Sequence, residues 1–117
     1  MPMRETEYAG GVPVDGYGPG FFRVAGQVHR GAVIVTAGGV RKWSGLGDAA
    51  PLVALGRTTD VLFLGMGADI ARPPAALVAL LEEAGLMVEP MSTPSAARSY
   101  NVTLSEGRRV ACALIPI

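Results

Sequence analysis

A glycine-rich turn is the first place where this sequence could do chemistry. The letters GMG, with Gly65 and Gly67 at their ends, follow the apolar run VLFL at residues 61–64 and precede a predicted helix. Such a turn can cradle a phosphate through its backbone N–H groups. Ile70 replaces the third glycine of the dinucleotide fingerprint, and Pro73 and Pro74 remove two donors near the start of the helix. We therefore favour a tight turn at the end of a strand over a phosphate site.

One carboxylate follows this turn closely. Asp69 stands just beyond the carboxyl end of a predicted strand, where open α/β sheets bind ligands. Asp15 and Asp60 also lie near turns but are scattered along the chain. Asp69 is therefore the best single candidate for an acidic group in a cleft.

Hydroxyl groups gather at the start of the last predicted helix, in the letters MSTPSAAR at residues 91–98. Ser92, Thr93 and Ser95 surround the helix N-terminus, and Arg98 lies one turn further on. The helix dipole, the hydroxyl donors and a guanidinium could together bind an anion. The simpler interpretation, which we favour, is that Thr93 caps the helix and the other side chains are solvated.

The same helix carries a polar residue on its inward stripe. Ala97, Tyr100, Asn101 and Leu104 fall on one face at helical spacing. A buried amide such as that of Asn101 needs hydrogen-bond partners. Asn101 either ties the helix to a nearby loop, in the glycine-rich segment before Phe21, or lines a cleft; we favour the first.

The remaining candidates give no catalytic, cofactor-binding or metal-binding set. His29 is the only histidine and is predicted at a hairpin tip, far in sequence from the only cysteine, Cys112. Cys112 lies in an apolar strand and is predicted to be an inert core residue. Trp43 and Tyr17 are either core residues or partly exposed aromatic residues at a contact surface.

Length and composition indicate one domain. The chain has 117 residues, 50% of them apolar, and a formal net charge of zero. The neutral charge argues against nucleic-acid binding, which needs a basic surface. The sequence shows no signal core and no apolar run of the ~18 residues that span a membrane. We expect a single domain over residues 1–117, with residues 1–9 a flexible N-terminal segment, in a soluble, cytoplasmic protein.

The first half of the chain predicts antiparallel strands joined by tight turns. Residues 21–28 form an irregular strand with a bulge at Gly26, residues 32–37 a β-branched strand, and residues 40–43 a short third strand. Asp48 is predicted to cap a short helix that continues to Leu55.

The second half alternates strands and helices. The apolar run at residues 61–64 suits a strand covered on both faces. A helix follows from Pro73, with a predicted buried stripe of Leu77, Leu80, Leu81 and Ala84. A strand, a helix from Thr93 and a last strand complete the chain, and the crossovers make the C-terminal strands parallel. The predicted fold is a single three-layer α/β domain: a central mixed sheet, parallel at its C-terminal strands and antiparallel at its N-terminal strands, with helices packed on it.

Two stretches carry a resemblance to a known family: VLFLGMGAD at residues 61–69 and MSTPSAARSYNVTLSEGRRVACALIP at residues 91–116. They resemble a family of small domains of unknown function that includes the adipogenesis-associated domain proteins and the third assembly factor of mitochondrial respiratory complex I. Ser99 stands where the family pattern leads us to expect Thr. The resemblance implies the same three-layer fold and supplies no catalytic residues. The matching positions are Thr93, Ala97, Tyr100, Asn101, Glu106 and Arg109.

These observations lead to two main functional hypotheses. The first, supported by the resemblance, is a non-enzymatic interaction or assembly module with a protein partner, including contact with the periphery of a membrane complex. The alternative is a small-molecule-binding protein or enzyme with a cleft at the C-terminal ends of the parallel strands. Nucleic-acid binding is the weakest hypothesis, no cofactor is assigned, and self-association is left open. The candidate cleft or contact residues are Gly65, Gly67, Asp69, Thr93, Arg98, Tyr100 and Asn101.

Overall fold

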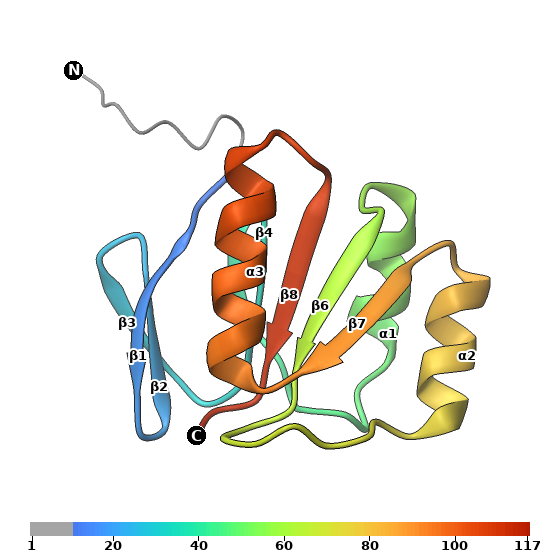
Figure 1. Ribbon diagram of the computed structural model, residues 1–117, viewed down its shortest axis with the longest axis horizontal. Helices are drawn as coiled ribbons and strands as arrows, with labels where there is room; N and C mark the ends of the chain where they lie inside the picture. Colours follow the sequence, from blue (N-terminus) through green and yellow to red (C-terminus); the bar gives the residue numbers. More distant parts are fainter. Residues whose placement is uncertain (1–10) are drawn as a thin grey trace.

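A computed structural model describes residues 11–117 (Figure 1). The segment 1–9, predicted to be flexible, lies outside the described residues. The larger of two sheets has five strands in the order β5-β4-β8-β6-β7. β6 is parallel to β7 and β8, whereas β4 is antiparallel to β5 and β8, so the predicted mixed sheet is confirmed. The strands are β4 (Val33–Thr36), β5 (Gly39–Lys42), β6 (Val61–Gly65), β7 (Met87–Met91) and β8 (Val110–Leu114).

Helices cover both faces of this sheet. Val61 and Phe63 of β6 belong to the core cluster beneath α3, whereas Leu62 and Leu64 belong to the cluster beneath α1 and α2. This alternation explains why the apolar run in β6 is unbroken, since both faces of the strand are covered. The predicted three-layer α/β arrangement is confirmed. The helices are α1 (Ala50–Val53), continued by a 3-10 turn (Ala54–Arg57), α2 (Ala75–Glu83) and α3 (Thr93–Ser105).

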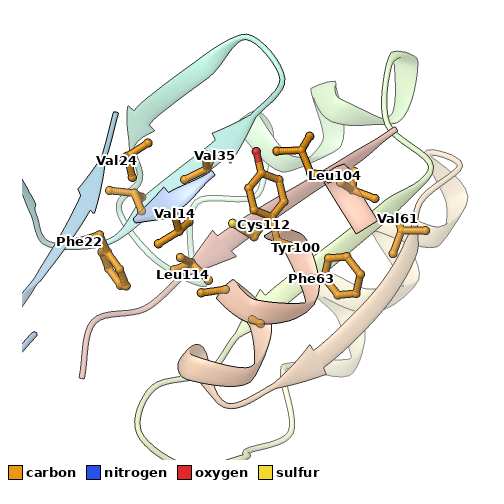
Figure 2. Close-up of a cluster of buried hydrophobic side chains, with 14 residues drawn as sticks. Val14, Phe22, Val24, Val35, Val61, Phe63, Tyr100, Leu104, Cys112 and Leu114 are labelled. Atoms are coloured by element: carbon orange, nitrogen blue, oxygen red, sulfur yellow. The ribbon is translucent and has the colours of Figure 1, made fainter. Parts of the chain in front are cut away.

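The N-terminal strands form a second, separate antiparallel sheet in the order β1-β2-β3. They are β1 (Val14–Gly18), β2 (Phe21–Val24) and β3 (Gln27–Arg30). This sheet shares the core cluster of α3, where Phe22 approaches the same buried region as Tyr100 (Figure 2). The antiparallel N-terminal strands were thus predicted, but their separation into two sheets was not.

A hairpin replaces the irregular strand predicted at residues 21–28. Ala25 and Gly26 both have positive φ, 52° and 77°, and form the two-residue turn between β2 and β3. Such a turn matches the twist of paired strands and returns the chain at once. Gly26 is therefore a turn residue and not a bulge, and His29 lies within β3 and not at a hairpin tip.

Three details of the helices differ from the sequence prediction. Asp48 does not cap α1, which begins at Ala50 without a side-chain cap. The Asp48 carbonyl oxygen instead accepts a hydrogen bond of 2.9 Å from the indole of Trp43, which is buried core. α2 begins at Ala75, two residues later than predicted. Leu80 leaves the predicted stripe and is 43% exposed, because α2 lies at the end of the sheet and buries a narrow face through residues such as Leu81.

Candidate functional site

Thr93 joins the carboxyl ends of three strands. Its Oγ1 accepts a hydrogen bond of 2.9 Å from the Gly67 N–H and donates one of 2.6 Å to the Ile115 carbonyl oxygen. Its own N–H donates to the Gly67 carbonyl oxygen at 2.7 Å. Gly67 follows β6, Thr93 follows β7 and Ile115 follows β8. A single buried side chain thus holds together the loops at the C-terminal ends of the parallel strands, where the sequence suggested a cleft.

Gly65 makes this close approach possible. A Cβ added at Gly65 would stand 2.8 Å from Thr93 Oγ1 and 2.9 Å from Thr93 Cα. Real Cβ atoms essentially never come so close, so glycine is required by packing. The space between these two loops is filled by Thr93, and the loops form a packed junction at this point.

Ser92, and not Thr93, caps α3. The Ser92 residue has extended backbone geometry, and its side chain accepts a hydrogen bond of 3.4 Å from the Ser95 N–H. The Ser92 and Ser95 hydroxyls also lie 3.1 Å apart in a hydrogen bond. The prediction that Thr93 is the cap is therefore wrong, because the Thr93 hydroxyl is already engaged with the backbone of two other strands.

Tyr100 is fully buried in the cluster beneath α3 (Figure 2). Its hydroxyl donates a hydrogen bond of 2.8 Å to the Val12 carbonyl oxygen. Burial, with a smaller contribution from Cys112, raises the pKa of the Tyr100 phenol above its usual range. Burial likewise raises the pKa of the Cys112 thiol. Both groups stay protonated near neutral pH, which makes Cys112 an unreactive core residue, as the sequence predicted.

Asn101 binds the backbone of the first strand. Its Nδ2 donates to the Val14 carbonyl oxygen and its Oδ1 accepts from the Val14 N–H, both at 2.9 Å. The half-buried Asn101 amide therefore has one hydrogen-bond partner for its nitrogen and one for its oxygen. Tyr100 and Asn101 together attach residues 12–14 to α3, which is the structural role that the sequence favoured for Asn101.

The candidate residues fall into separate groups. Gly65, Gly67 and Thr93 meet at the strand ends, whereas the side chains of Tyr100 and Asn101 are bonded to the segment 12–14. Asp69 is exposed on the loop after β6 and makes no side-chain hydrogen bond within residues 11–117. The remaining candidate, Arg98, lies on the outer side of α3.

An exposed ridge on α3 separates two grooves. Arg98 and Val102 are one turn apart, and Val102 is 51% exposed although it is apolar. Both residues line a groove toward β1, which also contains Tyr17, and a groove toward the edge strand β7. We call the second one the β7 groove; its volume is about 390 Å³. Its apolar lining comes from α3, β6 and β7: Val61, Phe63, Met87 and Val102.

Charged side chains complete the β7 groove. Arg98, Glu89 and Arg108 line it. Next to Val61, at the start of β6, Arg109 forms a two-pronged contact with Asp60, with nitrogen–oxygen distances of 2.8 and 3.2 Å. The Arg109 guanidinium, through this hydrogen bond, lowers the pKa of the Asp60 carboxyl.

Sequence reasoning singled out Arg98 but missed the rest of this groove. Val102 could have been noticed, because it is an apolar residue off the inward stripe of Tyr100 and Leu104. Met87 gave no such signal, since its exposure depends on β7 being the last strand of the sheet.

Within residues 11–117, no group of three or more His, Cys, Asp or Glu side chains is placed to hold a metal ion. Over the same range, no helix has both the length and the apolar character needed to cross a membrane.

Two known proteins are similar in sequence to this chain over nearly its whole length. An uncharacterised protein of Rhodobacter capsulatus is 56% identical over 117 residues, which cover 100% of this chain and 94% of that protein. The NADH dehydrogenase [ubiquinone] 1 alpha subcomplex assembly factor 3 of Danio rerio is 29% identical over 99% of this chain and 71% of that protein.

A solved structure and a family pattern agree with these relatives. The crystal structure of a protein from Bartonella henselae, described as an outer membrane protein, has a TM-score of 0.83 and 34% identity, covering 94% of this chain and 98% of that chain. The family described as "Protein of unknown function (DUF498/DUF598)" matches residues 14–115, from the first strand to just beyond the last. The chain therefore belongs to the family of proteins of unknown function DUF498/DUF598.

Proposed function

We propose that this protein is a non-enzymatic interaction module that docks on a protein partner during the assembly of a larger complex. The observation that carries the proposal is the exposed apolar surface of the β7 groove. Met87 is 58% exposed and Val102 is 51% exposed, and both line this one groove. Apolar side chains that line the same exposed hollow favour a contact with another surface.

The residue types on this surface are those found at protein interfaces. Tyr, Met and Arg are enriched in such contacts, and here Tyr17, Met87 and Arg98 lie on or beside the α3 ridge. Covering the exposed parts of Met87 and Val102 would contribute roughly 25 cal/mol for each Å² of apolar surface removed from water. This surface therefore suits a partner that covers α3 and the neighbouring edge of the sheet.

The relatives also support a role in the assembly of a larger complex. The Danio rerio relative is named as an assembly factor of NADH dehydrogenase, and this chain aligns with 71% of its length. An assembly factor acts by binding other proteins, which is what an exposed apolar groove is suited to do.

The test is affinity capture of the tagged protein from its own cells, with membranes included, followed by mass spectrometry. Val102→Asp places a charge on the ridge, and Val28→Asp is the matched control, because Val28 is 49% exposed on β3. We expect a partner that is recovered with the unchanged protein and the control but lost with Val102→Asp. Equal recovery with both variants, or recovery of the protein alone, would overturn the proposal.

A further inference from the structure

We infer that the β7 groove binds an amphipathic helix of the partner, with one apolar stripe and an acidic residue at each end of that stripe. This inference rests on the proposed function and specifies the chemistry of the partner. Three features of the groove favour such a helix: the edge of β7, the apolar walls and the two arginines.

The edge of β7 is unsuited to strand addition. The Met87 N–H donates to the Asp60 carbonyl oxygen, and the Met91 carbonyl oxygen accepts from the Met66 N–H. The alternate residues of a strand direct their backbone groups to the opposite side, so Val88 and Pro90 present theirs to the free edge. Because proline has no N–H, the Val88 N–H is the one donor that the strand offers there. A partner therefore docks through side chains and not through a new strand.

The walls of the groove favour contact with an apolar partner surface. Their hydroxyl groups are already bonded within the protein: Thr103 Oγ1 donates to the Ser99 carbonyl oxygen at 2.8 Å, and Ser99 Oγ contacts Met91 Sδ at 3.6 Å. Val102 of α3 and Met87, at the start of β7, line the same groove. A helix lying along α3 would place its own apolar stripe against these side chains.

Charge complementarity selects the ends of that helix. Arg98 and Arg108 both line the groove: Arg98 lies within α3, whereas Arg108 follows the end of α3, where its N–H donates to the Thr103 carbonyl oxygen. Asp60, whose pKa is lowered mainly by Arg109 and also by Arg108, is held in an ion pair by Arg109. Acidic side chains at both ends of the partner helix would therefore meet arginines.

Glu89 sets the charge in the middle of the groove. It is the middle residue of β7, is paired with Phe63 of β6, and lines the same groove as the two arginines. An acid at the centre of the partner stripe would be repelled by Glu89. The groove therefore favours an acidic–apolar–acidic pattern over a helix that is acidic along its whole length.

The inference is tested with a phage-displayed library of helical peptides, built on alanine and glutamine with randomised positions, selected against the full chain. We expect selected peptides to share an apolar stripe with an acidic residue at each end. Arg98→Glu/Arg108→Glu should weaken their binding roughly tenfold, since two attractive pairs become repulsive. Lysine in place of the peptide acids should restore binding to this double variant.

Controls separate this inference from its alternatives. Arg72→Glu is the matched control, because Arg72 is exposed and lies on the α2 side of β7; it should leave binding unchanged. Selected peptides that bind the double variant as well as the unchanged protein would overturn the inference. If no acid-flanked peptide is selected, either of two other results would overturn the inference. One is cosedimentation of the protein with vesicles of phosphatidylserine and phosphatidylcholine that the double variant abolishes. The other is dimerisation in sedimentation velocity that the double variant abolishes. A partner captured from cells and lost with Val102→Asp would still uphold the proposed function in that case.

Discussion

Asn101 and Val14 exchange two hydrogen bonds, each of 2.9 Å, although they are 87 positions apart in sequence. β1 pairs with β2 on one side only, so the free side of Val14 would otherwise present an unpaired N–H and carbonyl oxygen. The Asn101 amide supplies the donor and acceptor that a neighbouring strand would supply. The last helix is thereby fastened to the first strand.

Replacing Asn101 should loosen this attachment. Asn101→Ala removes both hydrogen bonds, and we expect it to lower the free energy of unfolding by about 1–3 kcal/mol. Hydrogen exchange should accelerate more at Val14 than in β6, because the lost contacts belong to β1. Asn101→Asp keeps an acceptor but loses the donor to the Val14 carbonyl oxygen, and should also destabilise. Urea unfolding checks the first result, and an unchanged midpoint would contradict it.

The roles of Thr93 and Ser92 can be separated by matched substitutions. Thr93→Val keeps the shape but removes the hydroxyl that bonds Gly67 and Ile115, and should cost about 1–3 kcal/mol of stability. Thr93→Ser keeps the hydroxyl and should cost less. Ser92→Ala removes the helix cap and should cost about 1 kcal/mol. Denaturant unfolding measures all three, and equal stability of the Val and Ser variants would refute the bonding role of Thr93.

Much of the fold could be predicted from the sequence, because local patterns and topology agree. The unbroken apolar run in β6 indicated a strand covered on both faces, and the alternation of strands with helices required parallel pairing. The hairpin at Ala25 escaped prediction, since alanine rarely adopts the positive φ of 52° found there.

The candidate site was less predictable, because its contacts come from distant segments. Ser92 and Thr93 carry adjacent hydroxyls, and the sequence cannot tell which of them caps the helix. The answer lies in the approach of Gly67 and Ile115, which belong to other strands. The exposure of Met87 likewise depends on the order of strands in the sheet.

Gly65 should tolerate no side chain. Gly65→Ala would bring a methyl group within 2.8 Å of Thr93 Oγ1 and 3.0 Å of Leu114 Cδ2. We expect a loss of about 1–3 kcal/mol in the free energy of unfolding from overpacking. Gly16→Ala is the matched control, because nothing lies within 4 Å of its added Cβ. Thermal unfolding compares the two, and similar melting temperatures would show that the junction at Gly65 is loose.

Cys112 should make stability fall at alkaline pH. Burial raises the pKa of its thiol in the folded state, whereas the thiol of the unfolded chain ionises near its ordinary pKa of about 8.5. The contribution of the protonated thiol to the free energy of unfolding is therefore fully present below about pH 8.5. It is lost as the pH rises above that value, at up to about 1.4 kcal/mol per pH unit. Urea unfolding of the wild type and Cys112→Ala from neutral to alkaline pH isolates the effect by difference. Parallel curves for the two proteins would contradict it.

Substitutions on the α3 ridge should impair partner capture and not stability, whereas substitutions at the Gly65–Thr93 junction should impair stability. Arg98 and Val102 are exposed and make no side-chain hydrogen bond within residues 11–117. Arg98→Glu and Val102→Asp should therefore change the free energy of unfolding by no more than about 0.5 kcal/mol. Val102→Asp should abolish partner capture and Arg98→Glu should weaken it, whereas Thr93→Val should reduce capture only as far as it reduces the folded fraction. Stability and partner capture are measured for each variant. A ridge variant that loses both stability and capture would assign Arg98 or Val102 to the fold. A ridge variant that loses capture alone assigns the substituted residue to the contact surface.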